Sequence, residues 1–357
     1  MNFELRIPWK VQTAAYSIYQ HGCSQLSQLA SRKKSDLQIS FYCNYHQITG
    51  STVAISCIAN HISRKHHVDA FIKPLSGYSR LLDLSVAQHF SADKLAGNPI
   101  FVDIEQENKV VNDLIADNRK VILSCHAFPA TLHSVAETVL RKNLELATYI
   151  HFVSDFQRSE FIRYFPDINM ESKSFVIPNY TRKSTKQYAT GNIGIIGHLN
   201  RDVKNAIKGI QLGQQSNARL VQCWGSDTVA GLDDPATYTK LRINGWSNNI
   251  LKVHKSFDVL ISASQSETFG LVVVEALSAG IPCLISDIPV FRELFSNCKG
   301  VIFMTGDDPT DIQSINHLLD QASTLNRSII EFWESHFSNE IISTTWFNRL
   351  SQINESP

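Results

Sequence analysis

The chain has 357 residues, 43% of them hydrophobic, which is enough for two domains that each bury a core of their own. Its 33 basic and 33 acidic residues balance, and the pI is near 7.2, so the sequence predicts no long-range electrostatic field of either sign. These totals speak against nucleic acid as a partner.

The cysteines and the N-terminus predict the compartment. The seven cysteines form no CxxC pair and sit mostly in apolar runs, which is typical of a reducing environment. Glu4, Arg6 and Lys10 stand where a secretory signal would need an uninterrupted apolar segment, and no run approaches 18 apolar residues. We therefore predict a cytoplasmic protein, with peripheral association at the inner face of the cytoplasmic membrane as a second option.

The first half of the chain alternates short apolar runs with amphipathic stretches. Strands are predicted at residues 38–43, 68–72, 120–125, 147–154 and 174–178, and helices at 52–65, 109–118 and 155–165. This alternation is typical of βαβ units and predicts an α/β domain with a mostly parallel sheet. Residues 1–36 have helical character and are expected to form a plain packed helix, with a membrane or partner contact as the alternative.

A polar stretch without apolar periodicity, residues 179–192, interrupts this rhythm and is predicted to be a linker. The alternation then restarts, which predicts a second α/β domain. Its strands are expected at 193–197, 219–225, 257–264 and 281–286, its helices at 204–215 and 270–280, and aromatic-rich helices at 329–337 and 344–353. Gly191, Gly194 and Gly197 are spaced three and three, whereas a dinucleotide fingerprint needs two and then three.

The segment "SETFGLVVVE", residues 266–275, carries two acids around an apolar run. The helix is expected to begin near Phe269 or Gly270, where a glycine lets an anion such as phosphate approach the free N–H groups of the first turn. Glu267 would precede that turn and Glu275 would lie about a turn and a half inside the helix. Alternatively, Glu267 only complements the helix dipole, with Ser266 or Thr268 as the N-cap, and Glu275 pairs with a distant Arg or Lys.

An unpaired acid on an apolar helix is costly, so Glu275 needs a partner. Pairs of sugar hydroxyls, which donate to one carboxylate, are suitable partners.

Three further strand ends carry candidate residues. His198, Arg201 and Lys204 follow the strand at 193–197, and a lysine at a helix start opposes the helix dipole unless an anion such as diphosphate is bound there. The alternative is a solvated basic loop. His126 ends a buried strand, either as a functional hydrogen-bonding group or as a structural residue. Gly50 precedes a helix and would permit a close backbone approach.

These residues together resemble the retaining glycosyltransferases of family GT4. Glu267 and Glu275, in "SQSETFGLVVVEALSAGIPCLISDIPVFRELF", resemble the E-x7-E motif of that family, and "GIIGHLNRDVKN" resembles its phosphate-binding basic motif. The segments "GSTVAISCIANHISRKHHVDAFI", "IHFVSDFQRSEF", "SFVIPN" and "NGWSNNILKVHKSFDVLISAS" also follow the family order. The resemblance covers roughly residues 38–330 and is stronger in the second half.

The resemblance implies an α/β fold of the GT-B class, with two Rossmann-like domains facing each other across a deep cleft. We expect an N-terminal acceptor-binding domain at 1–178, a linker at 179–192, a nucleotide-sugar-binding domain at 193–335, and a C-terminal helix at 336–357 that crosses back to the first domain.

The resemblance also implies roles for single residues. Glu275 would bind the ribose hydroxyls of a UDP- or GDP-sugar, and Glu267 would hold the donor sugar. Thr268 and the backbone N–H groups of Phe269, Gly270 and Leu271 would contact a phosphate, and Lys204 would neutralise the leaving diphosphate. His126 would lie close to the transferred sugar, and no divalent metal would be needed. Base contacts are guessed to lie at residues 245–250.

This sequence departs from the family pattern at two places. Gly197-His198 stands where the family usually has Gly-Arg, so Arg201 would have to replace the missing charge or the diphosphate is held less firmly. Gly50 stands alone where two adjacent glycines are usual, which weakens the assignment of the acceptor side.

The resemblance implies an enzyme that transfers a sugar, with retention of anomeric configuration, to a hydroxyl of a glycan or lipid-linked acceptor. The pathway would be synthesis of a cell-surface polysaccharide or lipopolysaccharide. Two alternatives stay open: a GT-B sugar-nucleotide epimerase, and a non-catalytic GT-B subunit that binds a partner or glycan, for which His198 is the best support. The sequence sets neither the donor sugar nor the oligomeric state.

Overall fold

The computed structural model describes residues 37–43, 50–64, 66–72, 81–83, 85–89, 91–132, 136–186, 189–247 and 249–356. These residues form two compact units. Unit 1 contains the described residues up to Val153, Arg158–Ile177, and those from Ser343 onward. Unit 2 contains Ser154–Gln157 and Pro178–Ile342. The helix expected within residues 1–36 lies outside the described residues.

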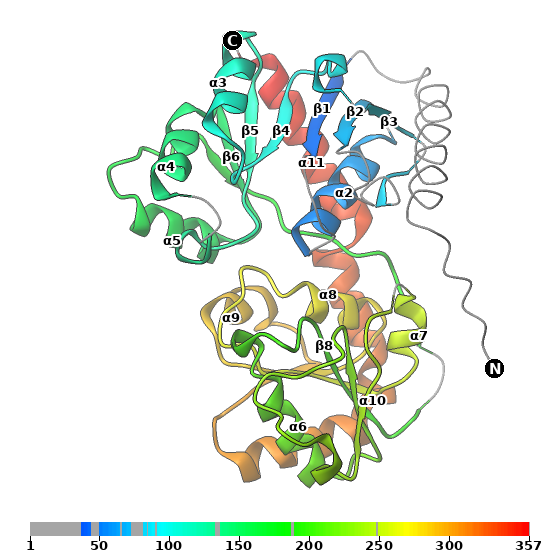
Figure 1. Ribbon diagram of the computed structural model, residues 1–357. Coiled ribbons are helices and arrows are strands. Elements are labelled where there is room, and N and C mark those ends of the chain that lie inside the picture. The colour runs from blue at the N-terminus through cyan, green and yellow to red at the C-terminus, as the bar shows by residue number, and fades with distance from the viewer. Residues whose placement is uncertain are drawn as a thin grey trace, which may run out of the picture. The chain divides into compact units, whose positions relative to one another are not determined.

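Unit 1 is built on a seven-stranded sheet in the order β3-β2-β1-β4-β5-β6-β7, and every neighbouring pair is parallel (Figure 1). The predicted mostly parallel sheet is confirmed. Its strands are β1 (Gln38–Cys43), β2 (His67–Ile72), β3 (Val86–His89), β4 (Ile100–Asp103), β5 (Val121–Ser124), β6 (Tyr149–Phe152) and β7 (Ser174–Val176). Strands β4 and β5 are buried along their whole length, as is usual for parallel strands covered on both faces.

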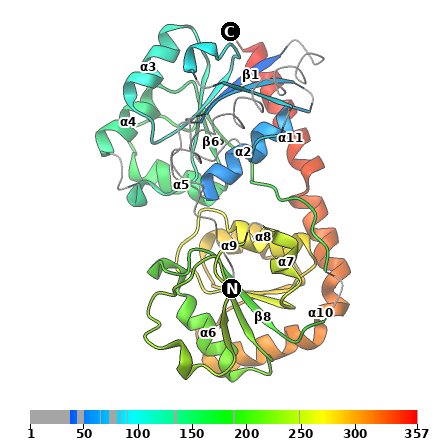
Figure 2. The ribbon, with the colours of Figure 1, turned by 45° about the vertical axis from the view of Figure 1, so that its right-hand side comes forward.

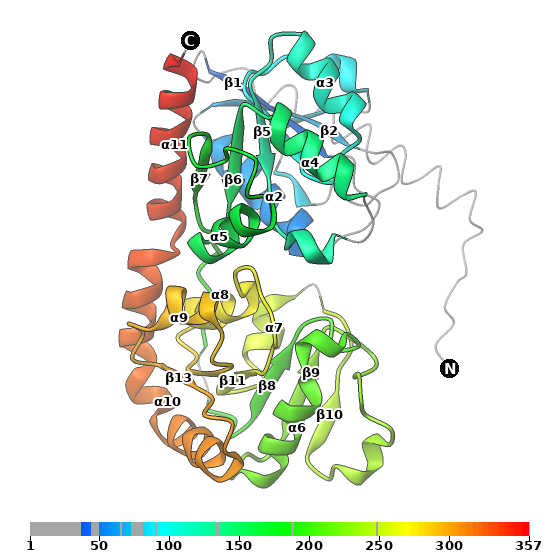
Figure 3. The same cartoon turned by 90° about the vertical axis from the view of Figure 1, so that its left-hand side faces the viewer.

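Helices cover both faces of this sheet. They are α2 (Gly50–Ile62), α3 (Asn108–Ala116), α4 (Glu137–Leu146), α5 (Asp155–Tyr164) and α11 (Asn339–Glu355), and short 3-10 turns occur at Ala92–Lys94 and Pro129–Thr131. Val102, Leu123 and Phe152 pack with apolar residues of α3, α4 and α5 in one core. On the opposite face, Phe101 packs edge-on against Trp346 of α11. Figure 3 shows helix α11 running along this sheet. Alternate strand residues therefore serve two separate cores.

Unit 2 contains a second parallel sheet, of six strands in the order β10-β9-β8-β11-β12-β13. Its strands are β8 (Ile193–Ile196), β9 (Val221–Trp224), β10 (Leu241–Ile243), β11 (Val259–Ser262), β12 (Cys283–Ile285) and β13 (Val301–Phe303). The chain builds one half outward from β8 and the other half outward from β11. The order of strands thus reverses between β8 and β11.

The helices of unit 2 are α6 (Ala206–Gln215), α7 (Ile250–His254), α8 (Leu271–Ser278), α9 (Pro289–Phe295) and α10 (Asp308–His336). Ile210 of α6 and Ile315 of α10 share a core with β8 and β11 on one face of the sheet (Figure 2). Later in α10, Asn326 donates hydrogen bonds to the carbonyl oxygens of Ala279 and Gly280, just after α8. Helix α10 therefore supports both α6 and α8.

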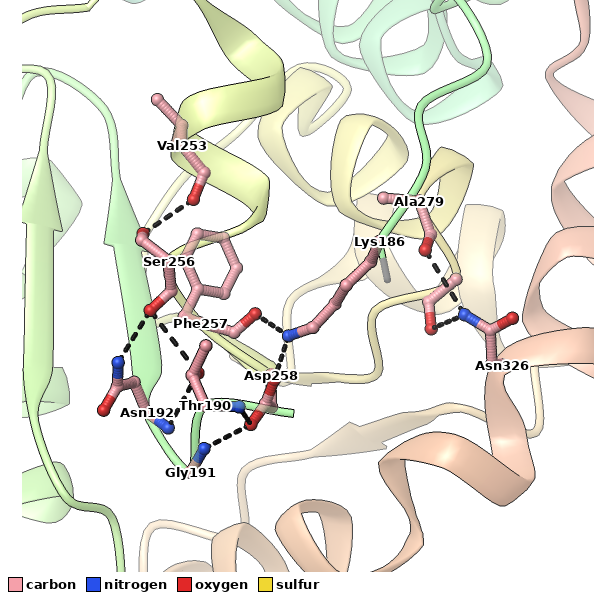
Figure 4. Close-up of polar contacts among 11 residues, drawn as sticks. Lys186, Thr190, Gly191, Asn192, Val253, Ser256, Phe257, Asp258, Ala279 and Asn326 are labelled. Carbon is pink, nitrogen blue, oxygen red and sulfur yellow. Dashed lines mark hydrogen bonds and ion pairs between the residues drawn. The ribbon is translucent and has the colours of Figure 1, made fainter. Parts of the chain in front are cut away.

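Asp258 holds the polar segment before β8 against unit 2 through hydrogen bonds and an ion pair (Figure 4). The Asp258 carboxylate accepts hydrogen bonds from the backbone N–H groups of Thr190 and Gly191, and it forms a buried ion pair with Lys186. Lys186 also donates to the carbonyl of Phe257. The described part of residues 179–192 is accordingly packed on unit 2.

Two features are absent from the described residues. No helix among them combines the length and the apolar character that crossing a bilayer would demand. No cluster of three or more His, Cys, Asp or Glu side chains in the same residues has the arrangement of a metal site.

Candidate functional site

The predicted residues of the second half gather where strands β8 and β11 end. These strands are parallel neighbours at the point where the strand order of unit 2 reverses. In open α/β sheets, ligands bind beyond the carboxyl ends of strands at such a reversal. The loop after β8 carries His198, Arg201 and Lys204, and the loop after β11 carries Glu267. The two candidate loops are therefore adjacent.

The loop after β8 corrects one expectation. Lys204 does not open a helix; it ends the 3-10 turn Asp202–Lys204, and Asn205 separates it from α6. Asn205 has a left-handed backbone with φ of 44°, a conformation that asparagine adopts more readily than most residues. The chain changes direction at Asn205, so the Lys204 side chain is not part of the first turn of α6.

Lys204 and Glu267 form an ion pair across the two loops. Their Nζ and Oε1 atoms are 2.5 Å apart, and the side chains are only 20% and 15% exposed. The backbone N–H of Gln265 also donates to the carbonyl of Val203 at 2.8 Å. The sequence interpretation treated this lysine and this glutamate separately. Their pairing gives Lys204 an anionic partner within the protein.

Helix α8 begins as predicted, without a side-chain cap. Gly270 is its N-cap, and neither Ser266 nor Thr268 accepts a hydrogen bond from the first turn, so that alternative is wrong. Among the described residues, no acceptor reaches the backbone N–H groups of Phe269, Gly270 or Leu271. An uncapped helix N-terminus is a favourable place for an anion.

Gly270 is required at this position by its backbone and by its neighbour. Its φ is +90°, a left-handed conformation, and a Cβ atom there would lie 2.5 Å from Cε1 of Phe291. Phe269 is 2% exposed and fixes the chain just before the helix. The open N–H groups are consequently held in one place by packing.

Glu275 lies in α8 between residues of the core. Val273, Val274 and Ala276 are fully buried, and Glu275 itself is partly buried. Burial raises the pKa of the Glu275 carboxyl to about 7. Throughout the described ranges, no hydrogen bond or ion pair reaches this carboxylate, which argues against the alternative of a distant Arg or Lys partner. Among the described residues, the Glu275 carboxylate thus has no partner.

His198 and Arg201 are exposed on the loop after β8. Partial burial of the ring lowers the pKa of His198, and the positive charges of Lys204 and Arg201 lower it further. His198 is therefore mainly neutral near pH 7, and the fixed positive charge of this loop belongs to Arg201 and Lys204.

The remaining predicted residues belong to unit 1. Gly50 was expected to precede a helix and is the first residue of α2, and residues 44–49 before it lie outside the described residues. His126 follows β5, and its Nε2 atom is 2.9 Å from Oγ of Ser124. Ser124 in turn contacts His151. The sequence interpretation did not select Ser124 or His151, although both are polar residues inside otherwise apolar strands.

The two α/β units, each built on a parallel sheet, define the GT-B fold class. A solved structure is similar to this chain over most of its residues. The crystal structure of Anabaena Alr3699/HepE in complex with UDP superposes with a TM-score of 0.70. It is 16% identical in sequence, and the match covers 88% of this chain and 100% of that chain.

The sequence of unit 2 carries a family pattern. Residues 193–331 match the family model described as "Glycosyl transferases group 1". This range contains the ion pair Lys204–Glu267, the start of α8 and Glu275. The predicted resemblance of the second half of the chain to glycosyltransferases is therefore confirmed as a match to group 1. The assignment to family GT4 stays a prediction.

Curated relatives match over shorter stretches. The O-antigen chain mannosyltransferase RfbU of Salmonella typhimurium is 26% identical over 142 residues, which are 37% of this chain and 40% of RfbU. The O-antigen biosynthesis glycosyltransferase WclY of Escherichia coli is 31% identical over 91 residues, which are 26% of each chain. The matched regions thus span less than half the length of either relative.

Proposed function

We propose that the protein is a glycosyltransferase that moves a sugar from a nucleotide-sugar donor to a hydroxyl of a glycan or lipid-linked acceptor. The observation that carries this proposal is the site in unit 2. There a paired Lys204–Glu267, an uncapped helix start and a Glu275 that no described residue binds occur together. The family match of residues 193–331 and the UDP complex of the structural neighbour support it.

The proposed donor is a UDP- or GDP-sugar, held along helix α8. Its diphosphate binds the N–H groups of Phe269, Gly270 and Leu271 with support from Thr268, because these groups stand at the positive end of the helix dipole. The ribose hydroxyls donate to Glu275, since a carboxylate accepts two such bonds. This contact satisfies the Glu275 carboxylate, which has no partner among the described residues.

Cations supply the charge that the leaving group needs. When the bond from the sugar carbon to the diphosphate breaks, its electron pair goes to the phosphate oxygen, and preorganised cations and N–H groups stabilise the growing charge. Lys204 provides one such charge, Arg201 a second in place of the family arginine, and His198 a neutral hydrogen-bonding group. We propose that no divalent metal takes part, and transfer measured with and without EDTA tests this.

Glu267 is proposed to hold the donor sugar beside the reacting carbon. The acceptor hydroxyl attacks from the face that the phosphate leaves, its oxygen forms the new bond, and its proton goes to the departing phosphate oxygen. Retention follows from this geometry and rests on the GT4 resemblance. The two acids lie on either side of a helix start, unlike the closely spaced carboxylate pair of retaining hydrolases.

Further parts of the proposal concern the base, the acceptor and the pathway. Trp246, within the segment guessed for base contacts, is 66% exposed and offers a face for stacking. His126 is proposed to contact the transferred sugar, and Gly50 to allow close approach on the acceptor side. We propose a role in polysaccharide or lipopolysaccharide synthesis, consistent with the names of RfbU and WclY, at the inner face of the cytoplasmic membrane.

Two measurements test the function. Calorimetry with UDP and GDP should detect binding, and a cognate donor at about 100 times its Kd should stabilise the protein by roughly 2.7 kcal/mol in a thermal-shift screen. Failure of every nucleotide to bind would favour the non-catalytic subunit. Product analysis with and without acceptor follows, because turnover of donor without acceptor would indicate an epimerase.

A further inference from the structure

Three polar side chains form a continuous hydrogen-bonded chain across the strand ends of unit 1. Ser124 of β5 and His151 of β6 are register partners on neighbouring parallel strands, so their side chains point to the same face. Both are fully buried. His126 follows Ser124 by two residues and is partly buried. Asp103 of β4, the register partner of Ser124 on its other side, is also polar and buried.

The contacts fix which atom donates in each bond. Nε2 of His151 lies 2.9 Å from the carbonyl oxygen of Ile177, which only accepts, so Nε2 carries the proton. In a neutral His151 ring, Nδ1 is then an acceptor, and the Ser124 hydroxyl, 2.9 Å away, donates to it. The Ser124 oxygen can therefore accept from Nε2 of His126 at 2.9 Å. By the same logic, Nδ1 of a neutral His126 bears no proton.

The surroundings keep both rings neutral and in place. The His151 ring packs edge-on against Trp346 at 4.7 Å between centroids and stacks on Phe175 at 5.6 Å. Burial lowers the pKa of His151 to about 4. Burial, followed by the nearby His151, lowers the pKa of His126 to about 3. Because neither ring is charged near pH 7, the donor pattern has one solution.

We propose that Ser124 and His151 are positioning residues that hold His126 as the neutral ring protonated on Nε2. Any group that meets Nδ1 must then donate a hydrogen bond. A hydroxyl of a sugar substrate does so, whereas a carbonyl or phosphate oxygen does not. This inference rests on the proposed function for its substrate, and on hydrogen-bond geometry alone for the state of the ring.

The ring state can be measured without any substrate. Long-range proton–nitrogen NMR of the full-length, 15N-labelled protein distinguishes a protonated Nε2 from a protonated Nδ1, and the spectrum of His126→Gln identifies the His126 signals. We expect Nε2–H for His126 in the unsubstituted protein. In Ser124→Ala the two tautomers should mix, because Nε2 loses its acceptor. Ser63→Ala is the control, since Ser63 is an equally buried, hydrogen-bonded serine of unit 1 away from this chain.

Two substitutions of His151 separate positioning from mere packing. His151→Asn places an oxygen near the Nδ1 position and should keep the acceptor for Ser124, so the Nε2–H state of His126 should persist. His151→Gln instead mimics the Nε2 donor to Ile177, and the tautomers should mix. A plain loss of packing would affect the smaller asparagine more.

Steady-state kinetics of sugar transfer provides the second measurement. With donor and acceptor present, kcat should fall about tenfold in Ser124→Ala and His151→Gln, with the donor KM nearly unchanged, since one neutral hydrogen bond is lost. A proton on Nδ1 in the unsubstituted protein, or an unchanged tautomer together with unchanged kcat in both variants, overturns the inference. If the unsubstituted protein transfers no sugar, the proposed function fails while the NMR result still decides the state of the ring.

Discussion

The buried polar groups at the strand ends of the two units find their partners in different ways. In unit 1, Ser124 and His151 are neutral and satisfy each other within the protein. In unit 2, Lys204 and Glu267 are a charged pair, and Glu275 has no partner in the described part of the chain. The contrast supports the proposal that a charged ligand completes the contacts of unit 2. Unit 1 instead presents a fixed, uncharged ring.

The largest expected effect comes from removing the acid of the charged pair. Glu267→Ala should lower the rate of transfer about 100- to 1000-fold, because the donor sugar loses a group that acts at the reacting centre. Steady-state kinetics with the cognate donor measures it. Asp308→Ala is the matched control, since Asp308 pairs with Lys208 in the same unit and should retain the rate. Full transfer by Glu267→Ala would remove the functional half of the contrast.

The next effect concerns the open start of α8. Gly270→Ala should destabilise the protein by about 3 kcal/mol, because a left-handed alanine is strained and its Cβ overlaps Phe291. Gly306→Ala, at φ +83° with nothing near its Cβ, should cost only about 1 kcal/mol. Urea unfolding measures both. Equal costs would mean that Phe291 yields and that α8 is not held as described.

A third test makes unit 2 resemble unit 1 by neutralising Glu275. Its pKa is about 7 when folded against 4.5 in the unfolded chain, so folding takes up a proton between these values and stability falls as pH rises from 4.5 to 7. Without donor, Glu275→Gln should therefore match the unsubstituted protein near pH 4.5 and exceed it above pH 7 by on the order of 2 kcal/mol.

The same substitution should weaken donor binding, since the amide offers one acceptor in place of a carboxylate. Unfolding curves at several pH values and calorimetry with the donor provide the two measurements. A pH-independent difference in stability would show that Glu275 is satisfied after all.

The smallest effect is the coupling between Lys204 and Glu267. A double-mutant cycle with Lys204→Ala and Glu267→Ala should give about 1 kcal/mol of coupling in the free protein, as expected for a partly buried pair. Saturating nucleoside diphosphate should reduce it, because Lys204 then turns to phosphate. The pair Lys208–Asp308 is the control and should keep its coupling when the nucleotide is added.

The sequence predicted the architecture better than the contacts. Apolar runs such as those at β5 and β11 are long enough to identify parallel strands, and the glycine before α8 indicated where that helix begins. Strands β3, β4, β10 and β13, of three or four residues each, were not predicted. A strand this short carries little periodicity of its own, and the other short strands were predicted only as parts of longer apolar runs.

The candidate site was predictable as a set of residues and not as a set of bonds. Lys204 and Glu267 are 63 residues apart and meet only because β8 lies beside β11. Ser124 and His151 are 27 residues apart and meet through the register of β5 and β6. Spacing along the chain specifies neither pairing. Glu275 was the exception, because an acid on an otherwise apolar helix indicates in the sequence itself that it needs a partner.

The contacts between Asp258 and the segment before β8 determine where a fragment that contains unit 2 should begin. Its polar sequence invites a truncation at Ile193, but that would discard Lys186, Thr190 and Gly191 and leave the Asp258 carboxylate buried without the groups it binds. A fragment that starts at Pro178 retains them. In hydrogen exchange, the backbone amides of Thr190 and Gly191 should accordingly be the slowest of this segment, although the segment has no regular secondary structure.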